Sequence, residues 1–326
     1  MSLSIVIPIY NEAEVLPELA QRIKRIFNSL PDKTEVLLVD DGSDVITKRA
    51  LSEIQKADSR FKVITLSRNF GHQQAITAGL ALSKGEAVAI MDGDLQDPPE
   101  LLPEFLRILN EGHDIVYGVR KNRKESWWLR GSYHLFYRGL SKLTTLDIPL
   151  DAGDFGVLSR RVVDLINNMP ETNRYVRGLR AYVGFNSIAV PYERQPRASG
   201  QPKFTISRLF NLASDGVFMF SSLPLRVATV VGVVVAIASI FYGIYLFGWR
   251  IFADDDIPGF ATLAVGMFFL GGVQLICIGI LGEYIARIHG EVKGRPGYIV
   301  DSNPKDSNGP DNPSFSVKST DTDRTP

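Results

Sequence analysis

Ala87-Val88-Ala89-Ile90-Met91 is a short apolar run that ends abruptly at Asp92-Gly93-Asp94. The run lies between Gly85 and Gly93 and predicts a buried strand, and open α/β sheets bind their ligands at the carboxyl ends of such strands. Two Asp side chains separated by one residue can bind one hard divalent cation, because Mg²⁺ favours a few carboxylates completed by water and substrate phosphates. Asp-Gly is also an ordinary turn pair, so the metal site becomes a prediction only together with the rest of the chain.

The composition indicates a chain with a large apolar core and no overall charge bias. Of the 326 residues, 45% are hydrophobic, which is enough for one large domain or two smaller ones. Lys and Arg together number 36 and balance 36 Asp and Glu, so the net charge gives no indication of a nucleic-acid partner, and we expect none. The single cysteine, Cys277, lies in an apolar stretch, excludes an intramolecular disulfide framework and is typical of packing.

Two apolar stretches predict a helical hairpin in a membrane. Residues 227–247 and 260–281 each run for about 20 residues without a charge, which is the length that spans a hydrocarbon core. The short turn between them is acidic, whereas the outer flanks are basic, so both flanks are expected in the cytoplasm and the turn outside. The charges used are Arg250 and Asp254 to Asp256 in the turn, and Arg226, Arg287, Lys293 and Arg295 in the flanks. Because the chain begins directly with a predicted strand, we expect no signal peptide.

The segments on either side of the hairpin have different characters. Residues 206–225 mix apolar side chains with Arg208 and Asp215, which predicts an amphipathic helix on the membrane surface, with a helix packed on the soluble domain as the alternative. From about Ser302 the sequence is rich in Asn, Asp, Ser, Pro and Thr and predicts a disordered tail. The predicted divisions are a cytoplasmic domain over 1–200, interface helices over 201–225, the hairpin over 226–282, a juxtamembrane segment over 283–301, and the tail over 302–326.

Strands and helices alternate along the first 120 residues. Repeated βα units predict an α/β fold, with a mostly parallel, right-handed sheet and helices on both faces. The expected strands are 4–9, 35–39, 62–66, 87–91 and 114–117, and the expected helices are 15–28, 47–57, 73–83 and 99–110. Neither the glycine fingerprint of dinucleotide folds nor a Gly-Lys-Ser/Thr phosphate loop is present in the sequence, so a bound nucleotide must be held by other residues.

Polar clusters follow four of the predicted strands. They are Pro8, Tyr10, Asn11 and Glu12; Asp40, Asp41, Gly42 and Ser43; Arg68, Asn69 and Gly71; and Asp92, Asp94 and Gln96. Each cluster alone is explained by a helix cap or a turn. Together they meet at one edge of a parallel sheet, where a buried carboxylate such as Asp40 can accept from a pyrimidine N–H and Tyr10 can stack on a base.

These motifs resemble the inverting A-type glycosyltransferases of family two. Within that family they are similar to the polyprenyl-phosphate glycosyltransferases of the dolichol-phosphate mannose synthase type, in particular the bacterial branch that makes polyprenyl-phosphate glucose. The resemblance covers about residues 3–300. The motifs that carry it are Pro8-Ile-Tyr10-Asn11-Glu12, Asp40-Asp41-Gly-Ser43, Arg68-Asn69-Phe-Gly71, Asp92-Gly-Asp94-Leu-Gln96-Asp97-Pro98, Asp151-Ala-Gly-Asp154-Phe, the hairpin, and Gly282-Glu-Tyr284 with Glu291-Val-Lys-Gly-Arg295-Pro296.

The resemblance implies a role for each matching residue. The nucleotide sugar would be held by Pro8, Tyr10, Glu12, Asp40, Asp41, Asn69, Gly71, Asp92 and Gly93. Mg²⁺ or Mn²⁺ would be held by Asp92, Asp94 and Gln96, and the catalytic residues would be Asp94 and Asp154, the latter as a base or a positioning carboxylate near the acceptor. The acceptor phosphate would meet Arg120, Arg123 and Lys203.

The resemblance also implies the reaction and the location. The expected reaction is metal-dependent, inverting transfer of a hexose to a polyprenyl phosphate on the cytoplasmic membrane face, with UDP-glucose as the leading donor and UDP as product. GDP-mannose, UDP-N-acetylglucosamine and a UDP-amino-arabinose derivative remain as donors, and a non-catalytic, membrane-tethered nucleotide-binding protein remains as a different class. A processive polysaccharide synthase would normally carry more membrane spans. The protein is expected in a bacterial inner membrane with its catalytic domain and both termini in the cytoplasm, and its membrane and juxtamembrane helices offer a surface for self-association.

One position departs from the family pattern. Many relatives carry Arg where this chain has Gly156, so one phosphate contact is missing, and Arg160, Arg161 and Arg177 remain open as replacements. Arg160 and Arg161 otherwise suit a solvated helix start. His72 follows Gly71 at a predicted helix start, where a cap or surface role and a diphosphate contact both remain open.

Overall fold

A mixed seven-stranded sheet forms the centre of the soluble part of the chain. The computed structural model describes residues 1–120, 152–172, 174–193, 223–252 and 259–301. The strand order is β3-β2-β1-β4-β6-β5-β7, and β6 alone runs antiparallel to its neighbours. The strands are β1 (Leu3–Ile9), β2 (Thr34–Asp40), β3 (Phe61–Thr65), β4 (Ala87–Ile90), β5 (Ile115–Arg120), β6 (Ala152–Ser159) and β7 (Ser187–Tyr192). The predicted mostly parallel α/β sheet is confirmed.

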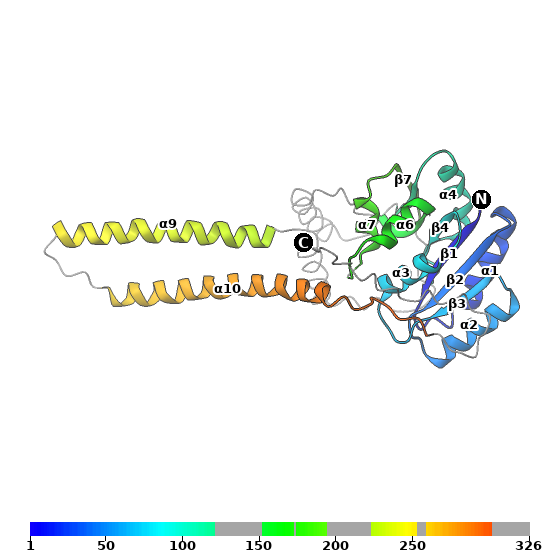
Figure 1. Ribbon diagram of the computed structural model, residues 1–326, viewed down its shortest axis with the longest axis horizontal. Coiled ribbons are helices and arrows are strands. Elements are labelled where there is room, and N and C mark those ends of the chain that lie inside the picture. The colour runs from blue at the N-terminus through cyan, green and yellow to red at the C-terminus, as the bar shows by residue number, and fades with distance from the viewer. Residues whose placement is uncertain (121–151, 173, 194–222, 253–258, 302–326) are drawn as a thin grey trace, which may run out of the picture.

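Helices cover both faces of this sheet (Figure 1). One face carries α1 (Leu16–Ile26), α2 (Val45–Ala57) and α4 (Leu102–Asn110), and the other carries α3 (His72–Leu82), α6 (Arg160–Asn168) and α7 (Val176–Tyr182). Short 3₁₀ turns, η1 (Phe27–Ser29) and η2 (Pro99–Leu101), extend the first layer. The spacing of apolar residues explains the packing of α1, because Leu16, Leu19, Ile23 and Ile26 recur on one side of the helix and all are buried.

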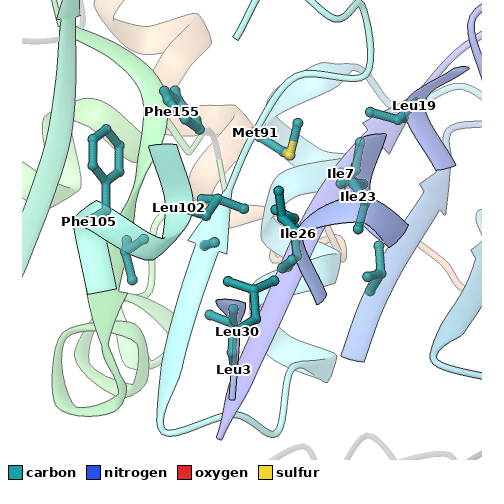
Figure 2. Close-up of a cluster of buried hydrophobic side chains, with 14 of the residues drawn as sticks. Leu3, Ile7, Leu19, Ile23, Ile26, Leu30, Met91, Leu102, Phe105 and Phe155 are labelled. Carbon is teal, nitrogen blue, oxygen red and sulfur yellow. The ribbon is translucent and has the colours of Figure 1, made fainter. Parts of the chain in front are cut away.

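The central strands are buried on both faces and hold the larger core in place. All seven residues of β1 are buried, as expected for a strand covered by helices on both sides. Figure 2 shows Ile7 and Met91 of the sheet region near Leu19 and Ile23 of α1. The Phe105 and Phe155 rings, with centroids 5.0 Å apart, tie α4 to β6.

The reversed direction of β6 brings a distant stretch of chain to the site edge. Gly156 pairs with Ile90 in the antiparallel ladder between β6 and β4. Continuing that register by two residues sets Asp154, near the start of β6, beside Asp92, just past the end of β4. An antiparallel strand begins where its parallel neighbours end, so β6 delivers its first residues to the carboxyl edge of the sheet.

Two long apolar helices follow the soluble domain and extend away from it (Figure 1). They are α9 (Leu223–Phe252) and α10 (Phe260–Val292), and within them Pro224–Trp249 and Val265–Val292 are long and apolar enough to cross a membrane. The predicted pair of helices is therefore present, although α10 continues well past residue 281 into the predicted juxtamembrane segment. The predicted interface helices before residue 223 and the tail from residue 302 lie outside the described residues.

After α10 the chain returns to the soluble domain. Val300 forms an antiparallel bridge with Leu66, just beyond β3. Ser67 N donates to Ile299 O at 2.9 Å, and Asp301 N donates to Thr65 O at 2.8 Å. Residues 297–301, here called the return segment, therefore join α10 to the outer edge of the sheet, as the trace beyond α10 in Figure 1 shows.

Candidate active site at the carboxyl edge of the sheet

Asp40 is a fully buried carboxylate at the end of β2. Its side chain has 0% exposure, and Oδ1 accepts from Ser43 N at 2.9 Å. Among the residues that the structure describes, Asp40 Oδ2 has no hydrogen-bond partner. A buried carboxylate oxygen without a partner is costly, which makes it a binding point for a ligand donor.

An open hollow lies next to the end of β1. Tyr10, which is 50% exposed, lines it together with Glu12 and Asp94, and its volume is about 410 Å³. Asn11 has a left-handed backbone, with φ of 54°, directly after β1. Such a conformation is uncommon for most residues other than glycine, but Asn adopts it more readily than most and suits this turn. The hollow therefore combines an exposed ring with carboxylates from two neighbouring strands.

Asp41 stabilises the loop after β3. Its two oxygens accept from Phe70 N at 2.7 Å and from Gly71 N at 2.9 Å. Gly42 lies so close to this loop that an added Cβ would be 2.5 Å from the Arg68 carbonyl carbon. What the structure gives Asp41 is a role in holding the loop that contains Asn69 and Gly71, and its contact with a nucleotide sugar stays a prediction.

The turn after β4 presents Asp92 and Asp94 directly before a residue with a strained backbone, Leu95. Gly93 has no room for a side chain, because an added Cβ would be 2.6 Å from Glu12 Oε2. Leu95 has φ of 60°, a genuine outlier for a bulky residue, while Gln96 N donates to Asp94 Oδ1 at 3.1 Å. Burial and the carboxylates around it raise the pKa of Asp92 to about 6. A cation would relieve this accumulation of negative charge.

The donor set of this turn fits a divalent metal ion that also binds substrate. In the described part of the chain, no group of three or more His, Cys, Asp or Glu side chains is arranged so that it could hold a metal ion by itself. Asp92 and Asp94 could therefore supply only part of a coordination shell. Mg²⁺ is commonly held by one or two carboxylates while phosphate oxygens and waters complete its octahedron, so these residues fit Mg²⁺ or the similarly oxygen-seeking Mn²⁺.

Asp154 is almost completely enclosed by hydrogen-bond donors. Arg177 Nε donates to Asp154 Oδ1 at 2.9 Å, and Gln73 Nε2 donates to Oδ2 at 3.1 Å. The Asp154 side chain is only 2% exposed, whereas that of Arg177 is 33% exposed. Burial alone would raise the pKa of Asp154, but His72 and Arg177 outweigh it and lower that pKa well below its ordinary range. A carboxylate this acidic and this fully engaged is suited to positioning a cation and poorly suited to taking a proton.

His72 links the two carboxylate groups of the edge. Its Nε2 lies 3.4 Å from Asp92 Oδ1 and 3.6 Å from Asp154 Oδ2. Burial would lower the pKa of His72, but Asp154 and Asp92 outweigh it and raise that pKa. The sequence leaves a cap or surface role and a diphosphate contact open for His72. The structure gives it a third role, as a bridge between the end of β4 and the start of β6.

Two further arginines gather around Gly153, next to Asp154. Arg180 is buried, donates to Gly153 O at 3.4 Å and lies 4.6 Å from the centre of the Tyr117 ring. Burial lowers the pKa of Arg180 to about 10, which still leaves it charged at neutral pH. The Arg120 guanidinium is next to Gly153, because a Cβ added at Gly153 would be 3.5 Å from Arg120 Nη2. Arg120 Nε is a buried donor without a hydrogen-bond partner among the described residues.

The sequence leaves three arginines open as replacements for the phosphate contact missing at Gly156, and they lie at opposite ends of the strands. Arg160 donates to Gly85 O at 2.8 Å, and Arg161 pairs with Asp114, so both lie at the edge where β4 begins. These two residues begin α6, as predicted, and the Arg161 side chain is 61% exposed, but both also contact groups at this edge of the sheet. Only Arg177 lies at the site. Arg123 and Lys203 lie outside the described residues.

Sequence reasoning missed Gln73 and Arg180 and left Arg177 undecided. Gln73 is the second residue of α3, immediately after Gly71 and His72, so its place in the polar run after β3 was an available signal. Arg177 and Arg180 lie on α7, which packs on the sheet through Val176 and Leu179. Their spacing marks one side of a short helix but does not identify what that side faces.

Comparisons with known proteins give a consistent family. The model described as Glycosyl transferase family 2 matches residues 4–166, and that described as GtrB C-terminal hairpin matches residues 223–288. The chain is 41% identical over 301 residues to an uncharacterized glycosyltransferase of Synechocystis sp., covering 92% of this chain and 95% of the relative. It is 37% identical over 301 residues to a prophage-derived bactoprenol glucosyl transferase of Shigella flexneri, covering 92% and 97%.

Among solved structures, a mannosyltransferase from Pyrobaculum calidifontis in complex with GDP-Man and Mn²⁺ is 18% identical to this chain. The match covers 87% of this chain and 86% of that one, with a TM-score of 0.46.

Proposed function

The chain belongs to glycosyl transferase family 2, and from this premise we propose that it transfers glucose from UDP-glucose to a polyprenyl phosphate, with inversion at the anomeric carbon and release of UDP. A relative that matches over nearly the whole chain is a bactoprenol glucosyl transferase, which supports this acceptor and this sugar. A direct displacement suits the layout, because no covalent sugar–enzyme intermediate is needed when the acceptor attacks opposite the leaving group.

The observation that carries the proposal is the separation of charge along one sheet edge. Asp92 and Asp94 follow β4, while Arg120, Arg177 and Arg180 surround the start of β6 next to them. Transfer between two phosphate compounds needs positive charge on both sides of the sugar. The arginines supply it for the incoming phosphate, and the carboxylates supply a place for the cation that the departing diphosphate requires.

The donor side of the site is assigned to the ends of β1, β2, β3 and β4 and the loops that follow them. Asp40 Oδ2 is the acceptor for a pyrimidine N–H, and Tyr10 is the stacking surface for the base. Asp92 and Asp94, with Gln96, would hold Mg²⁺ or Mn²⁺, which supplies Lewis-acid stabilisation of the diphosphate when bound. Pro8, Glu12, Asn69, Gly71 and Gly93 keep the donor contacts predicted from the sequence.

The acceptor side works by alignment and not by strong base catalysis. A phosphate monoester is already anionic at neutral pH, so it needs positioning and charge neutralisation more than proton removal. Asp154 acts as the positioning carboxylate, because both its oxygens are engaged and its pKa is lowered. Arg120 and Arg177 meet the acceptor phosphate, with Arg177 replacing the contact missing at Gly156. Arg123 and Lys203 stay predicted acceptor contacts.

The acceptor is lipid-linked, so the site must work at a membrane surface. The apolar hairpin α9–α10 supports an integral membrane protein of the bacterial plasma membrane, and its basic flanks support a cytoplasmic catalytic domain and cytoplasmic termini.

The test is transfer by the purified full chain in lipid nanodiscs containing a polyprenyl phosphate. A panel of UDP-glucose, GDP-mannose, UDP-N-acetylglucosamine and a UDP-amino-arabinose derivative is offered with Mg²⁺ or Mn²⁺ and, separately, with chelator. Mass spectrometry is expected to find polyprenyl-phosphate glucose only with UDP-glucose and metal. Transfer from another donor would replace the sugar assignment, and absence of transfer from every donor would contradict the enzymatic proposal.

A further inference from the structure

The last turn of membrane helix α10 contacts the soluble domain near the acceptor side of the site. Glu291 Oε2 accepts a hydrogen bond from Thr172 N at 2.8 Å. Thr172 lies in the connection between α6 and α7, and Arg177 is the second residue of α7. The motif around Glu291, which the reaction itself leaves unexplained, therefore touches the connection that leads to the acceptor arginine.

A second contact holds the same connection from the side of α3. Gln74 Nε2 donates to Thr172 O at 2.9 Å, so both backbone groups of Thr172 are engaged. The return segment packs tightly on Gln74, because an added Cβ at Gly297 would be 2.4 Å from Gln74 Oε1. Tyr298 and Val300 of the same segment are partly buried and pack against the same core cluster as Phe70 and Met169.

The far end of this connection is fixed to the active site. Val176 N donates to Gln73 Oε1 at 2.9 Å, and the amide nitrogen of the same Gln73 donates to Asp154. Arg177 then pairs with Asp154. Thr172 is thus held by α10, and Arg177 is held by the positioning carboxylate, Asp154.

We propose that Glu291 is a positioning residue for the acceptor phosphate, acting from the end of the membrane helix through Thr172 on Arg177. The inference rests on the proposed function, because it assumes that Arg177 meets the phosphate of a membrane-bound acceptor. The bilayer interface sets the depth of the lipid phosphate, and the apolar span of α10 sets the depth of α10 in the same bilayer, so a connection from α10 to Arg177 keeps cation and phosphate at one depth. The donor residues on β1, β2 and β4 are outside this connection.

The first test compares Glu291→Ala with Glu291→Gln and with the matched control Glu283→Ala. Glu283 lies on the same helix and pairs with Arg287 of α10, one turn away. Loss of one charge-assisted hydrogen bond corresponds to a change on the order of tenfold. We expect Glu291→Ala to raise the KM for polyprenyl phosphate about tenfold while the Kd of UDP stays unchanged. Glu291→Gln retains an acceptor oxygen and is expected to recover most of the loss.

A second variant reaches the same connection without changing Glu291. Gly297→Ala places a methyl group against Gln74 and is expected to displace its amide from Thr172. It should raise the same KM, and it should have no further effect in a Gln74→Ala background. Amide hydrogen exchange of the peptide containing Val176 and Arg177 is expected to increase in Glu291→Ala and Gly297→Ala, and to stay at the wild-type rate in Glu283→Ala.

The outcomes separate this inference from the proposed function. Wild-type protein that transfers no sugar contradicts the proposed function itself. Wild-type protein that transfers sugar, with a Glu291→Ala variant matching it in acceptor KM, overturns the positioning role. Equal losses in Glu291→Ala and Glu283→Ala, or a parallel rise in the Kd of UDP, also overturn it, because those results indicate a general disturbance of the fold.

Discussion

Replacing Asp154 by Asn tests whether this carboxylate positions the acceptor arginine. The substitution keeps the shape but removes the charge that accepts from Arg177 Nε at 2.9 Å and from Arg177 Nη2 at 3.3 Å. Hydrogen bonds to charged groups contribute about 1.5–3 kcal/mol, against about 0.5–1.5 kcal/mol for neutral ones. Two weakened bonds therefore cost roughly 2–3 kcal/mol, which corresponds to about a 100-fold loss at about 1.4 kcal/mol per factor of ten.

The assay measures glucose transfer to polyprenyl phosphate in nanodiscs, with UDP affinity measured by calorimetry on the same samples. We expect kcat/KM for the acceptor to fall about 100-fold while the Kd of UDP changes less than about threefold. Asp114→Asn is the matched control, because Asp114 is also a buried carboxylate paired with an arginine, Arg161, but lies at the opposite edge of the sheet. A parallel fall in UDP affinity would place Asp154 in the donor pocket, and an equal loss in Asp114→Asn would refute the positioning role.

Four further outcomes are expected. Asp94→Asn should abolish transfer with an unchanged melting temperature, because it alters one oxygen ligand in a turn, and transfer by chelator-treated wild-type protein would contradict the metal assignment. Asp40→Asn should weaken UDP binding about tenfold, because a carboxylate acceptor is replaced by an amide. If wild-type protein binds N3-methylated UDP as tightly as UDP, Asp40 Oδ2 does not accept a hydrogen bond from the base. Gly156→Ala should lower the free energy of unfolding by about 1–3 kcal/mol, because its Cβ would lie 2.5 Å from Val116 O in a packed sheet, and an unchanged denaturation midpoint would contradict this packing. Despite the burial of His72, Asp154 raises the pKa of this side chain, so the stabilisation that His72 gains from Asp154 is fully present below the ordinary His pKa of about 6.5 and is lost as pH rises through the higher folded value. The stability difference between wild type and Asp154→Asn should therefore shrink as pH rises from about 6 to 9, and a difference that stays constant or grows would contradict the sign of this shift.

The part of the fold that carries the proposed donor residues could be predicted from the sequence, because each strand is marked by its own local run of apolar residues. The strand predicted over 35–39 is observed as Thr34–Asp40, and its last residue is the buried carboxylate singled out beforehand. In a parallel sheet every strand of this kind ends at the same edge, so residues that follow apolar runs can be grouped from the sequence alone. The helix expected over 99–110 is divided into η2 and α4, with Pro103 near the start of α4, where its missing N–H is tolerated.

The acceptor half could not be predicted in the same way. It depends on the antiparallel direction of β6, which no local pattern indicates, and on the docking of α7, which brings Arg177 to Asp154 from 23 residues away. Among three arginines of equal appearance in the sequence, only tertiary packing distinguishes Arg177 from Arg160 and Arg161. Asp41 shows the converse, since its position at a strand end suggested a ligand contact while its oxygens hold the loop backbone.

The reversed strand has a consequence for how such enzymes diversify. Residues up to Gln96 form one half of the proposed reaction centre, and the described residues from Gly153 to Arg180 form the other. The two stretches meet at the ladder between β4 and β6 and through Gln73, whose side chain contacts Asp154 and Val176. Recombination between related genes at any point between these stretches would exchange the acceptor-recognising half and keep the donor-recognising half intact. In the proposed reaction, sugar choice and lipid choice can then evolve as separately inherited traits, provided that the pairing of β4 with β6 and the contacts of Gln73 are retained.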